Sequence, residues 1–275
     1  MTSGKQSKAQ RNESQDAVRA SRQAKIDAAG PKSSKAKPAL VGIVVAVIVA
    51  ALGLAVYFGS RSQAPAPTPT ASGTGGPQSG FPVGATGPDG GIVANPTTAK
   101  AGAPTLDIYE DFQCPACGQV EQALGSTIKK MADAGEVKVI YHMKNFLDAN
   151  LNNDSSTRAG NAAACAADAG KFPAYHDAIY ANMPAQEGMG YTDAQLEKVA
   201  GTAGITGSAL TTWKQCVSNK TYVDYVKRVE ESTAKAGITG TPAFRVNGKD
   251  FKLQDQQVTS AEDFRTKVLA AGAAK

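Results

Sequence analysis

The sequence of 275 residues predicts an α/β fold with the element order βαβ, a block of helices and ββα, preceded by one transmembrane helix. Strand-like, helix-like and strand-like segments follow one another between residues 105 and 142, the pattern of a parallel unit with a right-handed crossover. Near the C-terminus an Asn-Gly pair joins two alternating apolar runs, the strongest short-range signal for a β-hairpin. Residues 39–58 form an uncharged run long enough to span a bilayer.

The positive charge of the chain is concentrated at its start. Residues 1–38 hold nine of the 29 Lys and Arg residues and three of the 24 Asp and Glu residues, whereas the remainder is close to neutral. Few large apolar residues occur in this tail, so we expect it to be disordered. A basic arm could bind nucleic acid, but the apolar run that follows explains the charge better, and no nucleic-acid partner is expected.

The apolar run Ala39–Phe58 contains no charged residue and as a helix is about 30 Å long, the thickness of the hydrocarbon core. It is longer than the apolar core of a cleaved signal peptide, so we interpret it as an uncleaved anchor in the cytoplasmic membrane. Because cytoplasmic flanks are enriched in Lys and Arg, the N-terminus is predicted to be cytoplasmic. The rest of the chain is then predicted to be extracytoplasmic.

Residues 59–102 are rich in Pro, Gly, Ala, Ser and Thr and show no apolar periodicity. Such a composition does not build a core, so the segment is predicted to be a linker, stiff where prolines repeat and flexible where Gly and Ser repeat. The folded domain is expected to cover residues 103–275, with a short edge strand near its start at Ile92 and Val93.

The central motif lies where a predicted strand, Thr105–Phe112, gives way to a predicted helix. Cys114 falls near the N-cap of that helix and Pro115 at its first position, where the missing N–H costs nothing. From Cys117 onward apolar residues recur with the spacing of one helical face, at Val120, Leu124, Ile128 and Met131. Unpaired N–H groups and the helix dipole favour an anion at the N-terminus. Cys114 is therefore expected to ionise readily, and the thiolate is the form that attacks disulfides.

A C-x-x-C pair can also be half of a zinc site or a structural disulfide. Zinc needs about four ligands, usually in closely spaced pairs. Cys165 and Cys216 are solitary, and His142 and His176 are far apart in the sequence. Redox chemistry is therefore favoured. It needs no metal and no cofactor other than the cysteine pair itself, and neither is expected.

A second strand, Glu136–His142, completes the βαβ unit, and an alanine-rich block at about residues 155–237 is predicted to be a helical insertion. His176 and Trp213 lie in apolar surroundings and are assigned to the core. The β-hairpin is predicted for Thr241–Val246 and Lys249–Leu253, on either side of the Asn-Gly pair. A capping box of Thr259 with Glu262 is predicted to open a final helix.

Three stretches together resemble one family: YEDFQCPAC at residues 109–117, KFPAYHD at residues 171–177 and AGITGTPAF at residues 236–244. With them the chain resembles the DsbA-like thiol–disulfide oxidoreductases of the thioredoxin fold, in particular the membrane-anchored type of bacteria. The resemblance runs from about residue 101 to the end. It implies a thioredoxin fold (βαβ–ββα) with a helical insertion.

The resemblance also implies roles for residues. Cys114 is expected to be the nucleophile and Cys117 the buried partner that resolves the mixed disulfide, an order that the more exposed N-cap position supports. Pro242 is expected to follow a cis peptide bond, with Thr241 presenting backbone groups to the substrate. Between the cysteines, Pro115 and Ala116 shape the site. They differ from family members with histidine before the second cysteine, so less oxidising power is expected.

Two acids precede the motif. Asp111 is a candidate proton shuttle for Cys117, with a solvated strand-end acid as the alternative, and Glu110 is the weaker candidate. His142 could face the site, although a structural role is favoured. Cys165 and Cys216 are expected to form a disulfide that staples the helical insertion, because an extracytoplasmic location favours oxidation; two buried free thiols are the alternative.

The leading hypothesis for function is a dithiol oxidase that introduces disulfides into exported proteins and is recycled by a membrane redox partner. Its other expected partner is the lipid bilayer, through the anchor, and a monomer is expected. A reductase or isomerase would use the same site. A non-catalytic holdase or binding module, and a copper-delivery protein with His142 as third ligand, are alternatives from other classes.

Overall fold

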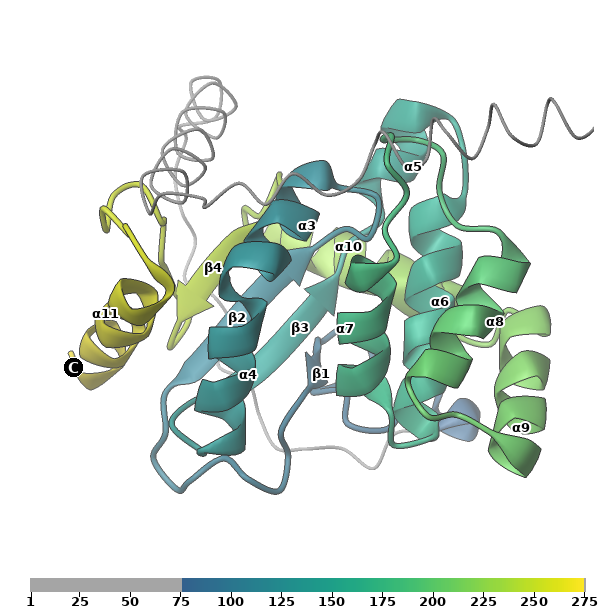
Figure 1. The fold of residues 1–275 in the computed structure, drawn as a ribbon, viewed down its shortest axis with the longest axis horizontal. Helices are drawn as coiled ribbons and strands as arrows, with labels where there is room; N and C mark the ends of the chain where they lie inside the picture. Colours follow the sequence, from purple (N-terminus) through teal and green to yellow (C-terminus); the bar gives the residue numbers. More distant parts are fainter. Residues whose placement is uncertain (1–75, 275) are drawn as a thin grey trace, which may run out of the picture. The chain divides into compact units, whose positions relative to one another are not determined.

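The computed structural model describes residues 76–274. Its centre is one five-stranded mixed sheet in the order β1-β3-β2-β4-β5, with β2 and β3 parallel and the remaining neighbours antiparallel (Figure 1). The strands are β1 (Ile92–Val93), β2 (Thr105–Glu110), β3 (Lys138–Met143), β4 (Ala243–Val246) and β5 (Lys249–Asp250). Strand β2 is the middle strand of the five, and its Leu106 and Ile108 are fully buried.

Helices cover both faces of this sheet. Figure 1 shows α3 and α4 in front of the strands and α10 behind them, with α6, α8 and α9 at one side and α11 at the other. The helical segments are η1 (Pro77–Ser79), α3 (Pro115–Val120), η2 (Glu121–Gly125), α4 (Ser126–Asp133), α5 (Phe146–Leu151), α6 (Ser155–Asp168), α7 (Phe172–Ala181), α8 (Asp193–Thr202), α9 (Gly207–Ser218), α10 (Val223–Lys235) and α11 (Ala261–Ala273). This is the predicted βαβ, helical block and ββα order.

The first helix of the βαβ unit follows the predicted apolar spacing. Segments α3, η2 and α4 succeed one another without a break, and η2 is a turn of π-helix. The four apolar residues with helical spacing are all buried: Val120, Leu124, Ile128 and Met131. Their stripe holds the helix against the sheet and so fixes the position of its N-terminus, where the two cysteines lie.

The helical insertion packs around α6, whose side chains are almost all buried. Because half of these buried residues are alanine, α7, α9 and α10 can approach α6 closely. Trp213 of α9 is 3% exposed and its Nε1 donates to the Ala162 carbonyl at 3.0 Å. The predicted core position of Trp213 is therefore confirmed, and so is the buried position of His176 on α7.

A disulfide joins Cys165 of α6 to Cys216 of α9 across 51 residues of sequence. The structure thus contains the pairing that the predicted extracytoplasmic location favoured, rather than two free thiols. The bridge ties two helices of the insertion together, and it leaves Cys114 and Cys117 as the free thiols of the described residues.

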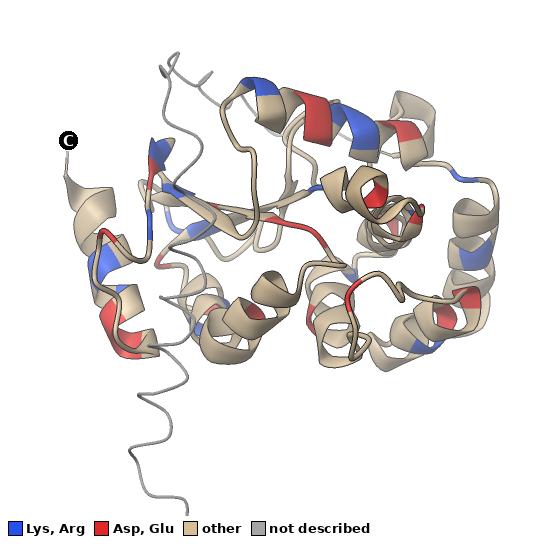
Figure 2. Cartoon of the chain, turned by 90° about the horizontal axis from the view of Figure 1, so that it is seen from above, with Lys and Arg blue, Asp and Glu red and all other residues tan. Residues whose placement is uncertain are grey.

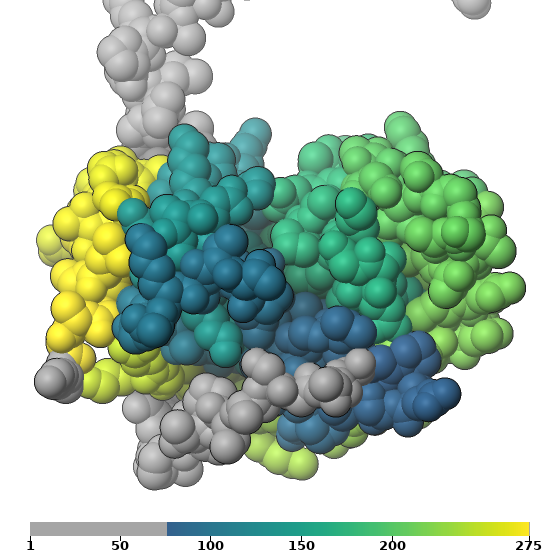
Figure 3. All heavy atoms as spheres, turned by 90° about the horizontal axis from the view of Figure 1, so that it is seen from below, coloured from purple at the N-terminus to yellow at the C-terminus, as the bar shows by residue number. Residues whose placement is uncertain are grey.

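The linker prediction is wrong for residues 76–102. Strand β1 pairs with β3, and the buried Asn95 side chain donates to the Ala132 and Val137 carbonyls and accepts from Val139 N–H, all at about 3 Å. Arg228 of α10 donates to the Pro88 carbonyl. Figure 3 shows the first described segment packed against the rest of the domain. The folded domain therefore begins before residue 103, because hydrogen bonds from distant elements compensate for its few apolar residues.

Element ends differ in detail from the sequence prediction. Strand β2 ends at Glu110 rather than Phe112, and β3 covers Lys138–Met143 rather than Glu136–His142. The hairpin turn at Asn247 and Gly248 is confirmed, with φ of 50° and 75°, although β5 is shorter than predicted. The cap of α11 is not Thr259 with Glu262.

The actual N-cap of α11 is Ser260, whose hydroxyl accepts from Asp263 N–H at 3.1 Å. Thr259 N–H instead donates to the Asp263 carboxylate. The capping pattern is thus shifted by one residue, which sequence spacing alone does not resolve because Thr259 and Ser260 are both good caps.

The predicted tail and membrane anchor, residues 1–58, lie outside the described residues. Between residues 76 and 274 no helix combines the length and the apolar character that crossing a bilayer requires. Basic and acidic residues are interspersed along the helices of this part (Figure 2).

The disulfide is expected to contribute substantially to stability. Replacing Cys165 and Cys216 by alanine should lower the free energy of unfolding by about 4 kcal/mol, since a loop of this length is released in the unfolded chain. Denaturant unfolding followed by the fluorescence of Trp213, the single tryptophan, measures the change. As a control, in a background that carries Cys114→Ser and Cys117→Ser, reductant should destabilise the protein that keeps Cys165 and Cys216 but not the one in which both are alanine. An unchanged unfolding free energy would contradict this role.

Candidate active site

The two free cysteines lie at the junction of β2 and α3. Cys114 is the N-cap of α3 and Pro115 its first residue, as predicted. Cys114 N–H donates to the Asp111 carbonyl at 2.9 Å, and Gly118 N–H donates to the Cys114 carbonyl at 3.2 Å. Cys114 is 7% exposed and Cys117 is completely buried. Cys114 is therefore the sulfur that solvent and substrates reach first.

The two thiols are shifted in opposite directions. A hydrogen bond from the Cys117 thiol lowers the pKa of Cys114 to about 6; burial opposes this, while Thr241 and the first backbone N–H groups of α3 add to the lowering. Burial raises the pKa of Cys117 well above its ordinary value, and its hydrogen bond to Cys114 adds to that. At neutral pH the pair thus holds one thiolate, on Cys114, and one proton, on Cys117.

The loop before β4 forms the other side of the site. The Thr241–Pro242 peptide bond is cis, as the resemblance implied, and Cys114 Sγ lies 3.5 Å from the Thr241 carbonyl oxygen. The Thr241 hydroxyl is buried and has no nitrogen or oxygen partner within residues 76–274. It acts on the sulfurs of Cys114 and Cys117 and lowers the pKa of both. Pairing of β4 with β2 brings this loop to the cysteines.

Pro115 is exposed and Ala116 half-buried, so both lie on the outer side of the pair. Neither carries a charge next to the thiolate. The low pKa of Cys114 therefore arises from hydrogen bonds rather than from a neighbouring cation.

Asp111 is completely buried. Its carboxylate forms hydrogen bonds that hold the turn between β2 and α3, and none of them is to a sulfur. Its carboxylate accepts from Gln113 N–H at 2.9 Å, Ser156 Oγ at 2.5 Å and Leu147 N–H at 3.3 Å. Burial raises its pKa to about 7, against the effect of these hydrogen bonds. The alternative of a solvated strand-end acid is excluded by this burial.

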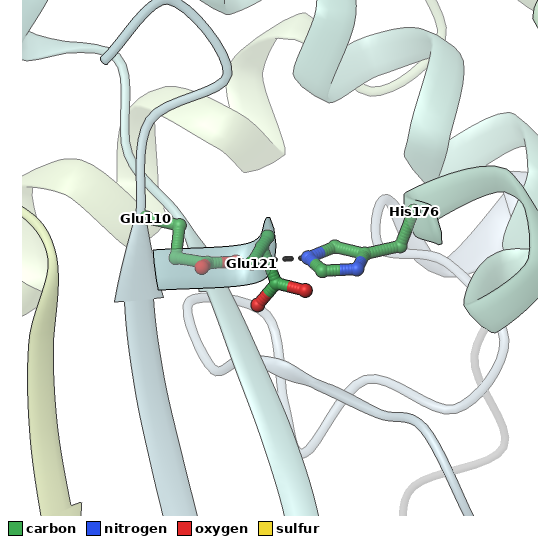
Figure 4. Close-up of side chains that lie close together, drawn as sticks. All are labelled: Glu110, Glu121 and His176. Atoms are coloured by element: carbon green, nitrogen blue, oxygen red, sulfur yellow. Dashed lines mark hydrogen bonds and ion pairs between the residues drawn. The ribbon is translucent and has the colours of Figure 1, made fainter. Parts of the chain in front are cut away.

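Glu110, the weaker candidate from sequence, is the acid whose charge acts on Cys117 and helps to raise its pKa. It is 4% exposed, and its Oε2 accepts from His176 Nε2 at 2.8 Å. Glu121 of η2 directs its carboxylate toward the same place (Figure 4). Sequence reasoning missed this group, because its members come from β2, η2 and α7.

The side chains of this group act on the pKa values of Glu121 and His176. Burial and the neighbouring Glu110 raise the pKa of Glu121 to about 9. Burial would lower the pKa of His176, but hydrogen bonds and charge from Asp177, Glu110 and Glu121 outweigh it and raise the pKa to about 10.

His142 does not join the cysteines. Its Nε2 lies 2.9 Å from Asp107 Oδ1, and its ring stacks on Tyr109 at a centroid distance of 4.4 Å. Each of these contacts is to a residue of β2, so the structural role that sequence favoured is the one observed, and a third copper ligand beside the thiols is not.

Gln113 is a further residue that sequence reasoning missed. Its side-chain Nε2 lies 2.8–3.0 Å from acceptor oxygens of Asp148 on α5, Asn153 after it and Ser156 on α6 of the helical insertion. Tyr191 adds a hydrogen bond from its hydroxyl to the Phe112 carbonyl. The insertion therefore fixes the backbone just before Cys114.

The thioredoxin family model, described as "Thioredoxin", matches residues 98–265, which include both cysteines and the cis-proline loop. The chain belongs to the thioredoxin family. Its described part is DsbA-like in fold.

Two solved structures from Mycobacterium tuberculosis illustrate the likeness. Oxidised DsbA is 28% identical, with 62% of this chain and 84% of that one covered and a TM-score of 0.51. The reduced disulfide bond oxidoreductase DsbG is 27% identical, with 69% and 95% covered and a TM-score of 0.54.

Among curated proteins, the M. tuberculosis serine/threonine-protein kinase PknE is 29% identical over 145 residues, which are 50% of this chain. The match covers 26% of the kinase, so this thioredoxin-family chain resembles about a quarter of that protein's length.

The thiol asymmetry predicts a titration. The far-ultraviolet absorbance of the thiolate in the reduced protein should show a midpoint at about pH 6. Cys117→Ala removes the main hydrogen-bond donor and should raise the midpoint toward the ordinary thiol value, whereas Cys117→Ser keeps a donor and should raise it less. Equal midpoints in all three proteins would show that Cys117 does not stabilise the thiolate.

Stability should follow the same ionisation. The folded pKa of Cys114, about 6, lies below that of an unfolded thiol, about 8.5. The stabilisation of the reduced form is therefore complete above the unfolded pKa and is lost as the pH falls through 6. Between these values the unfolding free energy of the reduced form, relative to the oxidised form, should rise by about 1.4 kcal/mol per pH unit. Denaturant unfolding of both forms checks this; Cys114→Ser should abolish the slope.

Proposed function

We propose that this protein is an extracytoplasmic dithiol oxidase that introduces disulfides into exported proteins through Cys114 and Cys117. The observation that carries the proposal is the stabilised reduced site: a thiolate on Cys114 with a pKa of about 6 beside a protonated, buried Cys117. A site whose reduced form is stabilised is a better electron acceptor, so its disulfide is readily passed on.

The proposed reaction starts from the Cys114–Cys117 disulfide. A substrate thiolate attacks Cys114 Sγ; the bond between the two cysteines breaks, and Cys117 leaves with the electron pair and takes up a proton. A second substrate thiolate then attacks the substrate sulfur of the mixed disulfide, and Cys114 leaves as a thiolate. The substrate has lost two electrons and gained one disulfide, and the enzyme dithiol has gained the two electrons.

The pKa values suit this direction. A leaving thiol departs faster when its pKa is low, which favours release of Cys114 in the second step. Cys117, whose pKa is raised by burial, retains the proton it takes up in the first step. Substrate backbone would be received beside the Thr241 carbonyl and Pro242, next to Cys114.

We further propose that residues 39–58 anchor the protein in the cytoplasmic membrane, with residues 1–38 inside and the domain outside, and that it acts as a monomer. The Cys165–Cys216 disulfide supports an oxidising location. A redox partner in the membrane would accept the two electrons from the reduced pair and restore its disulfide.

The proposal predicts an intermediate to oxidising reduction potential. Equilibration of the full-length protein with glutathione should give a value above the thioredoxin benchmark of about −270 mV and toward the DsbA benchmark of about −120 mV. A potential at or below the thioredoxin value would make the protein a reductase.

A matched activity test separates catalysis from binding. Oxidised protein should form a disulfide in a reduced peptide dithiol stoichiometrically, and Cys114→Ser should abolish this. Thr202→Ser, a conservative change on the exposed side of α8, serves as control. Undiminished binding of unfolded protein without any dithiol oxidation by the parent would favour a holdase.

A further inference from the structure

The cluster of Glu110, Glu121 and His176 is the strongest feature beside the cysteines that thiol exchange does not require. One ligand atom from each of the three residues lies within 4.8 Å of the other two. Figure 4 shows both carboxylates and the imidazole directed toward a common point from three elements. We propose that these three side chains form a binding site for a divalent transition-metal ion of the zinc class.

The donor set fits such an ion. Zinc binds imidazole nitrogen and carboxylate oxygen at about 2.0–2.2 Å, commonly with three protein ligands and one open position. Two donor atoms on one ion are then at most about 4.4 Å apart, so the observed spacing needs only small side-chain rotations. An incoming ion would displace the protons that Glu121 and His176 hold at neutral pH, since their pKa values are about 9 and about 10. Two carboxylates, a neutral imidazole and a divalent cation then have no net charge, which suits a buried site.

Unsatisfied polar atoms point to a missing ligand. Glu110 is 4% exposed, yet its Oε1 has no hydrogen-bond partner within residues 76–274, and the same holds for Glu121 Oε1. Buried polar atoms without partners are uncommon and call for an explanation such as an ion. Coordination would satisfy both oxygens at once.

Neighbouring side chains hold the imidazole in place. His176 Nε2 lies 2.8 Å from Glu110 Oε2. Its other nitrogen, Nδ1, lies 3.8 Å from Asp177 Oδ1, too far for a hydrogen bond, and has no hydrogen-bond partner within residues 76–274. Tyr141 and Tyr180 pack on the ring with centroids 4.0 and 5.1 Å away, so its orientation is fixed.

The backbone at Glu121 is also unusual. Glu121 begins the π-helical turn η2, and such turns are rare and frequent at functional sites. A Cβ on Gly125 would come within 2.5 Å of Glu121 Oε2, so glycine at this position leaves room for the carboxylate. Glu121 is partly exposed and provides the entry side for an ion.

The site is tested with zinc on the oxidised full-length protein, in which the Cys114–Cys117 disulfide cannot ligate metal. Competition with a chromogenic chelator should show one saturable zinc site. Glu121→Gln and Glu110→Gln, which keep side-chain size, should each weaken binding by about tenfold or more. Glu231→Gln, an exposed position of α10, is the matched control and should leave the affinity unchanged.

Cobalt provides an independent readout. The oxidised parent should show visible d–d bands without a sulfur-to-cobalt charge-transfer band, and Glu121→Gln should lose them. Zinc should also raise the unfolding midpoint of the parent and of Glu231→Gln but not that of Glu121→Gln. Absence of saturable zinc binding by the parent, or equal affinity in the parent and Glu121→Gln, would overturn the site. Neither result depends on dithiol oxidation, so the proposed function stands or fails separately.

Discussion

A single proton shared unequally by two sulfur atoms is the constraint on which this site depends. Cys114 caps α3 and receives hydrogen bonds from the Cys117 thiol and from the first backbone N–H groups of the helix. Cys117, three residues further on, has turned into the protein interior and is fully buried. The same short helix therefore stabilises a thiolate at one cysteine and a thiol at the other.

This asymmetry requires a rigid frame, and distant segments provide it. The parallel pairing of β2 with β3 and the antiparallel pairing with β4 place β2 at the centre of the sheet, so α3 starts from a fixed point. The β4 pairing also brings Thr241 to Cys114 across 127 residues. From the helical insertion, Ser156 and Tyr191 bond to Asp111 and to the Phe112 carbonyl. The insertion is thus part of the site's foundation.

Buried acids surround this frame at some cost to stability. Removing a carboxylate from water is unfavourable unless hydrogen bonds or opposite charge compensate. Asp111 has three such hydrogen bonds, and they hold the turn before Cys114. Glu110 and Glu121 are compensated less completely, since each keeps one oxygen without a partner among the described groups. Groups of that kind are retained where they bind or react.

The amino-acid sequence by itself determined what depends on near neighbours. The apolar spacing after Cys117, the Asn247-Gly248 turn and the N-cap position of Cys114 are local features, and the structure contains all three. Only the tertiary structure decided what depends on long-range contacts. It placed residues 76–102 in the domain through bonds such as those of Asn95, and it ranked Glu110 above Asp111 in its effect on Cys117. The reason is physical: periodicity reports local backbone geometry, whereas burial and charge depend on which distant residues the fold brings together.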